Sequence, residues 1–241
     1  MENQEKRDYV VPATILVAAA LIAGALIYST GLKNTKPGTQ TADVGQNNQP
    51  AQQITSPQID GAAVLGDQKA PLTIFIFSDY QCPYCGKFYT ESELLIRKNY
   101  VDTGKVNMVY KNLAFLGPES VSAANAAECA KDQAKFWNYH DALYNIEIKE
   151  SQTKGNSENT GNLTRDTFKQ IATDLKMNVN DFLACYDSQK YAAEIQNDIQ
   201  EANTLLPQAS TPTIFIGDKV IQGAYPYDVF SQAIDTALNK K

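Results

Sequence analysis

Residues 72–85 read LTIFIFSDYQCPYC, and this stretch decides the fold. Its first six residues form an unbroken apolar run with β-branched members, which is typical of a strand buried on both faces of a sheet. A CPYC motif follows at residues 82–85, and residues 87–99 then have helical spacing of apolar side chains. The inner face of this helix is expected to carry Phe88, Leu94, Leu95 and Tyr100. A strand, a CxxC pair and a helix in succession predict a redox-active dithiol.

The two cysteines of the motif are expected to differ in reactivity. Cys82 would lie at the helix N-terminus, where unpaired backbone N–H groups and the helix dipole favour a thiolate. Pro83 suits the first helical turn because it has no N–H to lose there. Cys85, one turn further along, can reach the same sulfur. We therefore expect Cys82 to be the nucleophile and Cys85 to be the buried resolving thiol.

Two other uses of a CxxC pair have to be considered. A structural zinc site would need two further ligands, and the candidates are Cys129, Cys185 and the single histidine, His140. None of these forms a second closely spaced pair, so the ligand spacing of a zinc site is missing. The other alternative is an inert structural disulfide. No metal and no organic cofactor is expected.

Further strands and helices are predicted beyond the dithiol. Strands are expected at residues 106–110, 213–216 and 219–222, the last two as a hairpin across Gly217-Asp218. A helical block opens at Gly117-Pro118-Glu119, with a proline and an acid in its first turn. Helices are expected at residues 123–134, 136–146, 164–175 (capped by Thr164), 180–186, 188–206 and 227–238, with a polar loop at 151–162. The order of these strands and helices along the chain predicts an α/β fold with an all-helical insertion at about residues 117–206.

Four segments together resemble a known family. They are residues 77–85 (FSDYQCPYC), 136–140 (FWNYH), 211–213 (TPT) and 223–227 (GAYPY). With this combination the chain, from about residue 61 to its C-terminus, resembles the DsbA-like thiol:disulfide oxidoreductases of bacteria, which belong to the thioredoxin superfamily. The resemblance implies a thioredoxin-like core with an inserted helical subdomain. It also implies an enzyme that exchanges disulfides with unfolded or reduced exported proteins.

The resemblance assigns roles to two residues far from the CPYC motif. A proline directly before a strand has no ladder N–H to contribute, and Pro212 has this position. The family implies that Pro212 is a cis proline packed against the active disulfide. It further implies that the backbone of Thr211 pairs, strand to strand, with an extended client chain. Pro226 is expected to be an ordinary helix-start proline. Reoxidation of the dithiol by a quinone-linked membrane protein is implied as well.

Tyr84 departs from the family pattern. The strongly oxidising members carry a histidine between the two cysteines, and a histidine can stabilise the thiolate by its charge, whereas a tyrosine cannot. We therefore expect the pKa of Cys82 to be less depressed, and the disulfide to be less oxidising, than in those members. The substitution favours isomerase or reductase activity relative to disulfide formation.

Asp79 lies three residues before Cys82, at the end of the predicted buried strand. Its carboxylate is a candidate proton acceptor for the resolving thiol Cys85. The alternative is a turn aspartate that caps the following helix through its carboxylate, and we favour this alternative slightly.

Three further residues outside the motif are candidates. A structural disulfide between Cys129 and Cys185 is favoured over two buried free thiols, and would stabilise the domain by ~4 kcal/mol. His140 is expected to have a packing or helix-surface role rather than a catalytic one. The other members of the same helical segment that we expect in the core are Trp137, Tyr139 and Tyr144.

The first 60 residues differ from the rest of the chain. Residues 10–28 form a stretch without a charge, which as a helix would be ~28 Å long, close to the ~30 Å core of a bilayer. We expect a cytoplasmic N-terminus at residues 1–9, a single-pass transmembrane signal anchor at 10–28 and a disordered linker at 29–60. Residues 61–241 would then be the catalytic domain, on the outer side of the cell membrane. A cleaved signal peptide is the alternative to the anchor.

The overall composition limits the function further. A net charge of −6 and a pI near 4.9 argue against a nucleic-acid partner, which requires clustered Lys and Arg. We expect disulfide formation in exported clients, with a membrane redox partner that reoxidises the dithiol. The alternatives are a disulfide reductase or isomerase, and a non-enzymatic tethered chaperone whose disulfide only stiffens the fold.

Overall fold

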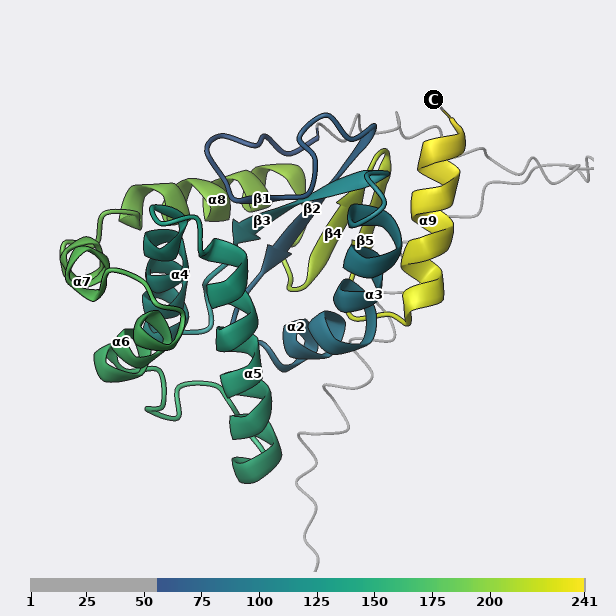
Figure 1. Cartoon of the computed structure of the whole chain (residues 1–241). Coiled ribbons are helices and arrows are strands. Elements are labelled where there is room, and N and C mark those ends of the chain that lie inside the picture. Colours follow the sequence, from purple (N-terminus) through teal and green to yellow (C-terminus); the bar gives the residue numbers. More distant parts are fainter. Residues whose placement is uncertain (1–55, 241) are drawn as a thin grey trace, which may run out of the picture. The chain divides into compact units, whose positions relative to one another are not determined.

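The structure of the chain is a computed structural model that describes residues 56–240 (Figure 1). The expected cytoplasmic segment, the span at residues 10–28 and the linker up to residue 55 lie outside the described residues. Between residues 56 and 240, no helix has both the length and the apolar character that crossing a bilayer requires. Gln58, near the end of the expected linker, already contacts the domain, because its backbone N–H donates to Glu201 Oε1 at 2.7 Å.

A five-stranded sheet with the order β1-β3-β2-β4-β5 forms the centre of the described region. Strand β2 (Leu72–Ser78) pairs in parallel with β3 (Val106–Asn112) and antiparallel with β4 (Thr213–Ile216). The outer strands are β1 (Val64–Leu65) and β5 (Lys219–Gln222). The central place of β2 explains its unbroken apolar sequence, and the predicted hairpin is confirmed. Strand β1 has two residues, which are too few to produce a pattern.

Helices cover both faces of the sheet. The even-numbered apolar side chains of β2 pack against α9 (Tyr227–Asn239) and against the helix that follows the CPYC motif. Phe88 and Phe230 meet there edge to face, with ring centroids 5.0 Å apart. The odd-numbered side chains pack against α8 (Ala192–Leu205) on the opposite face. The CPYC motif at the end of β2 is therefore held by a strand that is fixed from both sides.

The helical segment that follows the CPYC motif is irregular. It consists of α2 (Pro83–Phe88), a π-helical turn (Tyr89–Glu93), α3 (Leu94–Ile96) and a second π-helical turn (Arg97–Val101). A π-turn changes the phase of the helix and so rotates its buried face. Leu94 and Leu95 are consequently 41% and 40% exposed, and their predicted place on the inner face is wrong. Glu93 is buried instead, which brings a charged group into the interior.

The insertion between β3 and β4 is helical, as predicted. It contains α4 (Pro118–Lys131), α5 (Phe136–Lys154), α6 (Arg165–Asp174), α7 (Val179–Asp187) and α8. Figure 1 shows α4 to α7 beside the sheet, on the side away from α9. Thr164 caps α6 as expected, because its side chain accepts from the Thr167 N–H. Helix α5 continues to Lys154, so the loop predicted from residue 151 begins later, at Gly155, whose φ of 75° ends the helix.

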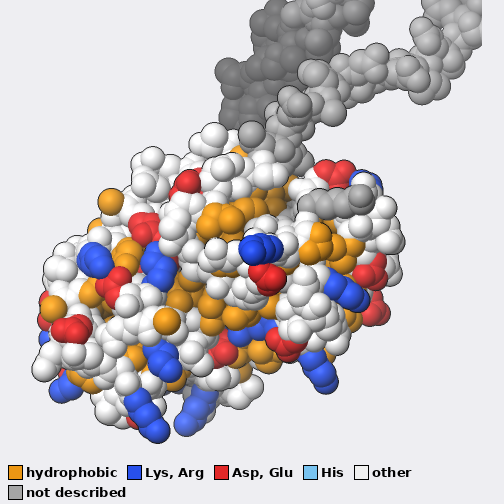
Figure 2. Space-filling view, turned by 45° about the horizontal axis from the view of Figure 1, so that its top comes forward, with side chains coloured by type: hydrophobic (Ala, Val, Ile, Leu, Met, Phe, Trp, Pro, Cys, Tyr) orange, Lys and Arg blue, Asp and Glu red, His pale blue; other side chains and the backbone are white. Residues whose placement is uncertain are grey.

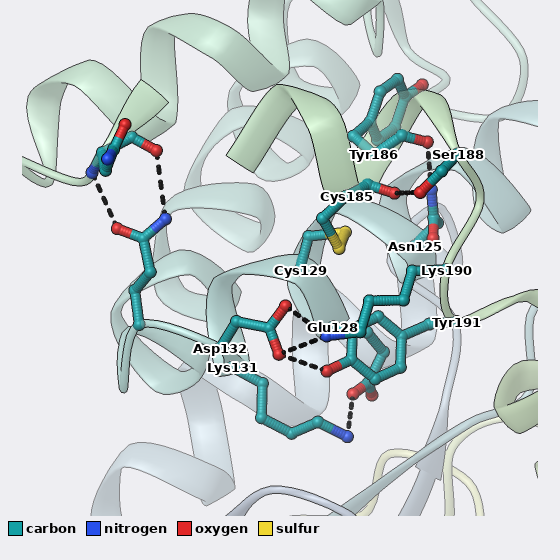
Figure 3. The surroundings of a disulfide bond; sticks show 12 residues. Asn125, Glu128, Cys129, Lys131, Asp132, Cys185, Tyr186, Ser188, Lys190 and Tyr191 are labelled. Atoms are coloured by element: carbon teal, nitrogen blue, oxygen red, sulfur yellow. Dashed lines mark hydrogen bonds and ion pairs between the residues drawn. A yellow bond between two sulfur atoms is a disulfide. The ribbon is translucent and has the colours of Figure 1, made fainter. Parts of the chain in front are cut away.

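Two of the cysteines join helices of the insertion. Cys129 of α4 and Cys185 of α7 form a disulfide bond, with their Cα atoms 5.8 Å apart (Figure 3). Close to it, the side chains of Lys190 and Tyr191 converge on the Asp132 carboxylate, at 2.7 and 2.6 Å. The disulfide and these polar contacts tie α4 to α7 and to the segment that follows α7.

A buried ion pair fixes the end of β3. On the face shown in Figure 2, acidic and basic side chains both lie among hydrophobic ones. In the interior, however, Lys111 is only 3% exposed, and its Nζ lies 2.9 Å from Asp198 and 3.0 Å from Glu201. Both carboxylates belong to α8. This ion pair fixes the end of β3. The loop that follows β3 contacts Asp79, next to the CPYC motif.

Candidate active site

The two thiols of the CPYC motif lie at the start of α2 in unequal positions. Cys82 occupies the N-cap, and Pro83 the first turn, as expected. The backbone N–H groups of Cys85 and Gly86 donate to the Cys82 carbonyl at 3.0 and 3.1 Å. Cys82 keeps an exposure of 7%, whereas Cys85 is fully buried. Both are free thiols, so this is the dithiol form of the pair.

Hydrogen bonds stabilise the thiolate of Cys82. Donation by the Cys85 thiol lowers the pKa of Cys82 from 9.0 to about 6, against the effect of burial, with further help from the Thr211 hydroxyl and two backbone N–H groups. Burial and the neighbouring Cys82 thiolate raise the pKa of Cys85 well above its ordinary value. At neutral pH Cys82 is therefore the anionic nucleophile and Cys85 is a neutral thiol.

Tyr84 takes part in this site through its backbone. Its N–H is one of the groups that lower the pKa of Cys82, while its side chain is 66% exposed. A thiol pKa of about 6 lies between the ~7 of thioredoxin and the ~3.5 of DsbA. The pKa of Cys82 is therefore less depressed than that of DsbA, as expected for a motif without a histidine.

The loop before β4 lies beside Cys82. The Thr211–Pro212 peptide bond is cis, which is the isomer that the family resemblance implies. The Cys82 sulfur lies 3.7 Å from the Thr211 carbonyl oxygen, and the Pro212 carbonyl accepts from the Gly223 N–H at 2.7 Å. Next to this loop is a groove of about 350 Å³, whose lining includes Tyr84, Thr211 and Tyr225. Thr211 therefore both lines this groove and contacts the Cys82 sulfur.

Asp79 is buried, and backbone N–H groups occupy its carboxylate. Oδ1 accepts from Gln81 at 2.9 Å, and Oδ2 accepts from Phe115 and Leu116 at 3.0 and 3.2 Å. None of these three donors belongs to α2, so the idea that Asp79 caps this helix is wrong. Its carboxylate instead joins the CPYC turn to the loop after β3. Burial raises the pKa of Asp79, although a hydrogen bond from Ser120 and those of the backbone oppose the rise. A proton-acceptor role stays a prediction.

The sequence pattern does not reveal two polar side chains near the dithiol. Glu147 of α5 is 3% exposed, and with Cys82 it lines a second cavity, of about 220 Å³. Burial raises the pKa of Glu147 to about 7. Ser78, at the end of β2, hydrogen-bonds to Tyr144 at 2.7 Å, and it slightly opposes the rise in the pKa of Cys85. Across residues 56–240, no group of three or more His, Cys, Asp or Glu side chains is arranged to hold a metal ion.

This geometry supports one kind of chemistry. A thiolate at a helix N-terminus can attack, or be attacked in, a disulfide, and the buried thiol behind it can close or release the bond. On a thioredoxin-like sheet with a cis proline loop beside it, this site defines the class of the protein as a thiol–disulfide oxidoreductase.

Known proteins agree with this class. The family model described as Thioredoxin matches residues 58–236. Disulfide bond formation protein D of Bacillus subtilis is 32% identical over 187 residues, which are 77% of this chain and 81% of that protein. The crystal structure of oxidised BdbD from Bacillus subtilis aligns with a TM-score of 0.67 and 29% identity, over 76% of this chain and 96% of that one. The chain therefore belongs to the thioredoxin family, as a DsbA-like thiol–disulfide oxidoreductase.

Another similarity covers only part of a much longer protein. The Na(+)/H(+) antiporter NhaA 1 of Salinispora arenicola is 29% identical over 179 residues, which are 73% of this chain but 24% of the antiporter. The match therefore concerns a single region of that protein, and the antiporter's own activity is not transferred to this chain.

Proposed function

We propose that this protein promotes disulfide formation in exported proteins through Cys82 and Cys85. The thiolate-stabilising environment of Cys82 is the observation that carries the proposal. A stabilised thiolate stabilises the reduced dithiol and so makes the disulfide a stronger oxidant. With a pKa of about 6 instead of 9.0, ionisation favours the reduced form ~10-fold more at neutral pH, which raises the reduction potential by ~30 mV. The similarity to a protein named for disulfide bond formation supports the same direction.

The exchange proceeds in two displacements. A client thiolate attacks Cys82 of the oxidised pair, the Cys82–Cys85 bond breaks, and Cys85 leaves as a thiolate that takes up a proton. A second client thiolate then attacks the client sulfur of the mixed disulfide, and Cys82 leaves as a stable thiolate. The groove beside Thr211 would hold the client in an extended form, with the backbone of Thr211 as its pairing edge.

The proposal includes a location and a partner. Residues 10–28 would anchor the chain in the cell membrane as a single pass, with the catalytic domain on the outer side, where disulfides persist. Each turnover leaves Cys82 and Cys85 reduced, so a redox partner must reoxidise them. A membrane protein linked to quinones has the required chemistry, and the anchor would keep the domain within its reach.

A reductase or isomerase is the second candidate, and the observation that favours it is Tyr84 in place of a charged residue. A glutathione redox titration of the full-length chain separates the two. Differential alkylation and mass spectrometry of the peptide with Cys82 and Cys85 would report this pair alone. A potential closer to the ~−120 mV of DsbA supports disulfide formation, whereas a value near the ~−270 mV of thioredoxin would replace it with reduction of clients.

A further inference from the structure

Cys82 lies between two clefts. One is the groove of about 350 Å³ lined by Thr211, whose carbonyl oxygen is 3.7 Å from the Cys82 sulfur. The other is the cavity of about 220 Å³ that Cys82 lines together with Glu147 and Ile148 of α5. We call them the Thr211 groove and the α5 cavity.

Helix α2 separates the two clefts. Figure 1 shows this helix between α5 and α9. It packs closely on α5 at Gly86, where an added Cβ atom would come within 3.2 Å of Ile148 Cγ1. On its other side it packs against α9. The segment that leads from β5 toward α9 lines the Thr211 groove. A client chain joined to Cys82 therefore has a different cleft on each side of the start of α2.

The two clefts differ in charge. Of the residues between 56 and 240 that line the Thr211 groove, only Lys87 carries a charge. Lys87 also borders the α5 cavity, but there the lining includes two carboxyl groups, those of Glu91 and Glu147. The Thr211 groove is therefore the positive side of Cys82, and the α5 cavity is the negative side.

Glu147 has a free acceptor in the acidic cleft. Its Oε1 accepts from Asn162 Nδ2 at 2.6 Å, whereas its buried Oε2 has no hydrogen-bond partner among the described residues. A buried carboxylate oxygen without a hydrogen bond is costly in free energy. A cationic group in the α5 cavity would therefore be attracted by Glu147 as well as by Glu91.

The ion pair between Lys87 and Glu91 does not cancel this difference. Lys87 Nζ lies 3.9 Å from Glu91 Oε2, and the two side chains are 50% and 54% exposed. An exposed pair of this kind contributes little to stability, so each side chain is free to turn toward a client group of opposite charge.

The geometry of an extended chain decides which client residues meet the clefts. Side chains alternate along a strand, so the immediate neighbours of a client cysteine point away from the surface that the cysteine faces. The second residue on each side faces the same surface as the cysteine, at ~7 Å from it along the chain. These two client positions lie on opposite sides of the reacting sulfur.

We propose that the two clefts select clients by charge: an acidic side chain on one side of the client cysteine lies in the Thr211 groove beside Lys87, and a basic side chain on the other side lies in the α5 cavity beside Glu91 and Glu147. The favoured client is thus a polypeptide whose cysteine is flanked, two residues away, by opposite charges in one particular order. This inference rests on the proposed exchange with polypeptide clients, but it holds for either direction of electron flow.

Two peptides of identical composition test the proposal. Both have blocked ends, and they read Gly-Glu-Gly-Cys-Gly-Lys-Gly and Gly-Lys-Gly-Cys-Gly-Glu-Gly, one of them with a heavy-isotope label. Full-length Cys85→Ser protein, which retains the mixed disulfide at Cys82, is equilibrated with both peptides in a glutathione buffer. The Cys82 thiolate attacks the peptide sulfur of a peptide–glutathione disulfide, and glutathione leaves as the thiolate. Mass spectrometry gives the ratio of the two Cys82 adducts, and the ratio of the two peptide–glutathione disulfides corrects for intrinsic reactivity.

The corrected ratio should differ from one by at least ~3-fold, because each exposed ion pair is worth a ~1.4- to 5-fold change and the reversed order loses both pairs. The net charge of the protein has no effect on the ratio, since both peptides carry the same charges. In 1 M salt, where the Debye length is ~3 Å, the ratio should approach one. A ratio of one at low salt would overturn the proposal.

A charge swap assigns the preference to the clefts. Lys87→Glu/Glu91→Lys keeps the net charge and the ion pair but reverses both signs, so the ratio should fall to about one or invert. The matched control is Arg165→Asp/Asp187→Arg, which swaps an exposed pair between α6 and α7 that lines neither cleft. Its ratio should stay within about twofold of the native one. A preference that survives the swap at Lys87 and Glu91 would also overturn the proposal.

The redox titration of the native Cys82–Cys85 pair is independent of this experiment. A potential near that of thioredoxin, together with a charge-dependent ratio, would reject disulfide formation and keep the two clefts. A high potential with equal adducts would do the opposite.

Discussion

The two cysteine pairs of this chain are almost equally buried, yet their chemistry differs. The outer cysteines, Cys82 and Cys185, are 7% and 8% exposed, and the inner ones, Cys85 and Cys129, are both at 0%. Exposure therefore does not explain which pair is reactive. Cys82 caps the N-terminus of α2, where N–H groups favour a thiolate. Cys129 and Cys185 both lie in the last turn of their helices, where the dipole disfavours a negative charge. The end of the helix on which a cysteine lies decides its role.

The largest expected effect distinguishes the two pairs by activity. Cys82→Ser should reduce catalysed oxidation of a reduced substrate protein by at least ~10³-fold, because the nucleophile is lost. The double variant Cys129→Ser/Cys185→Ser should retain activity within about threefold. Turnover of reduced substrate with purified protein gives both values. Substantial activity in Cys82→Ser would mean that another group performs the exchange.

The second effect distinguishes the pairs by stability. The bond between Cys129 and Cys185 closes a loop with a sequence separation of 56 residues. Its removal in the same double variant should lower the free energy of unfolding by ~4 kcal/mol on the chain-entropy estimate. Urea unfolding of the oxidised proteins measures this, and the potential of the Cys82–Cys85 pair should be nearly unchanged. A large shift of that potential would show that the two pairs are coupled.

Several elements of the fold could be predicted from the sequence, because each depends on residues that are neighbours along the chain. The strand at residues 72–77, the hairpin before α9 and the cap at Thr164 depend on neighbouring residues, and the structure confirms them. The π-helical turns that expose Leu94 and bury Glu93 have no pattern of this kind. The buried polar contacts of Ser78 with Tyr144 and of Tyr80 with His140 join residues 66 and 60 positions apart, so only the folded structure brings them together. Of the two roles expected for His140, packing or a place on the helix surface, the structure shows packing, because the side chain is fully buried.

A smaller effect concerns the pH dependence of the potential. Cys82 has a lowered pKa, so above about pH 6 the reduced dithiol holds one proton instead of two. The potential should fall by ~59 mV per pH unit below this point and by ~30 mV above it. In the same way, the stabilisation of the reduced fold by the thiolate is lost as the pH falls through about 6. A glutathione titration at several pH values locates the break. A single slope through this range would mean that Cys82 is not stabilised as a thiolate.

The smallest effect concerns the side chain between the cysteines. Tyr84→His would place a cationic ring near the Cys82 thiolate, which should raise the potential. Because the side chain at this position is 66% exposed, water screens the charge, and we expect a change of ~30 mV or less. Tyr84→Phe is the control, since the backbone N–H that stabilises the thiolate is kept. A change well above this size would show that the exposed side chain sets the potential.

The thiolate of Cys82 is the central claim, and its titration in the reduced full-length protein tests it most directly. Thiolate absorbance in the ultraviolet, with Cys82→Ser as the baseline, gives the pKa without reference to any substrate. The account predicts a transition at about pH 6 that is absent from the variant. A transition at the ~8.5 of an ordinary free cysteine would contradict both the assignment of Cys82 as a stabilised nucleophile and the role in disulfide formation that rests on it.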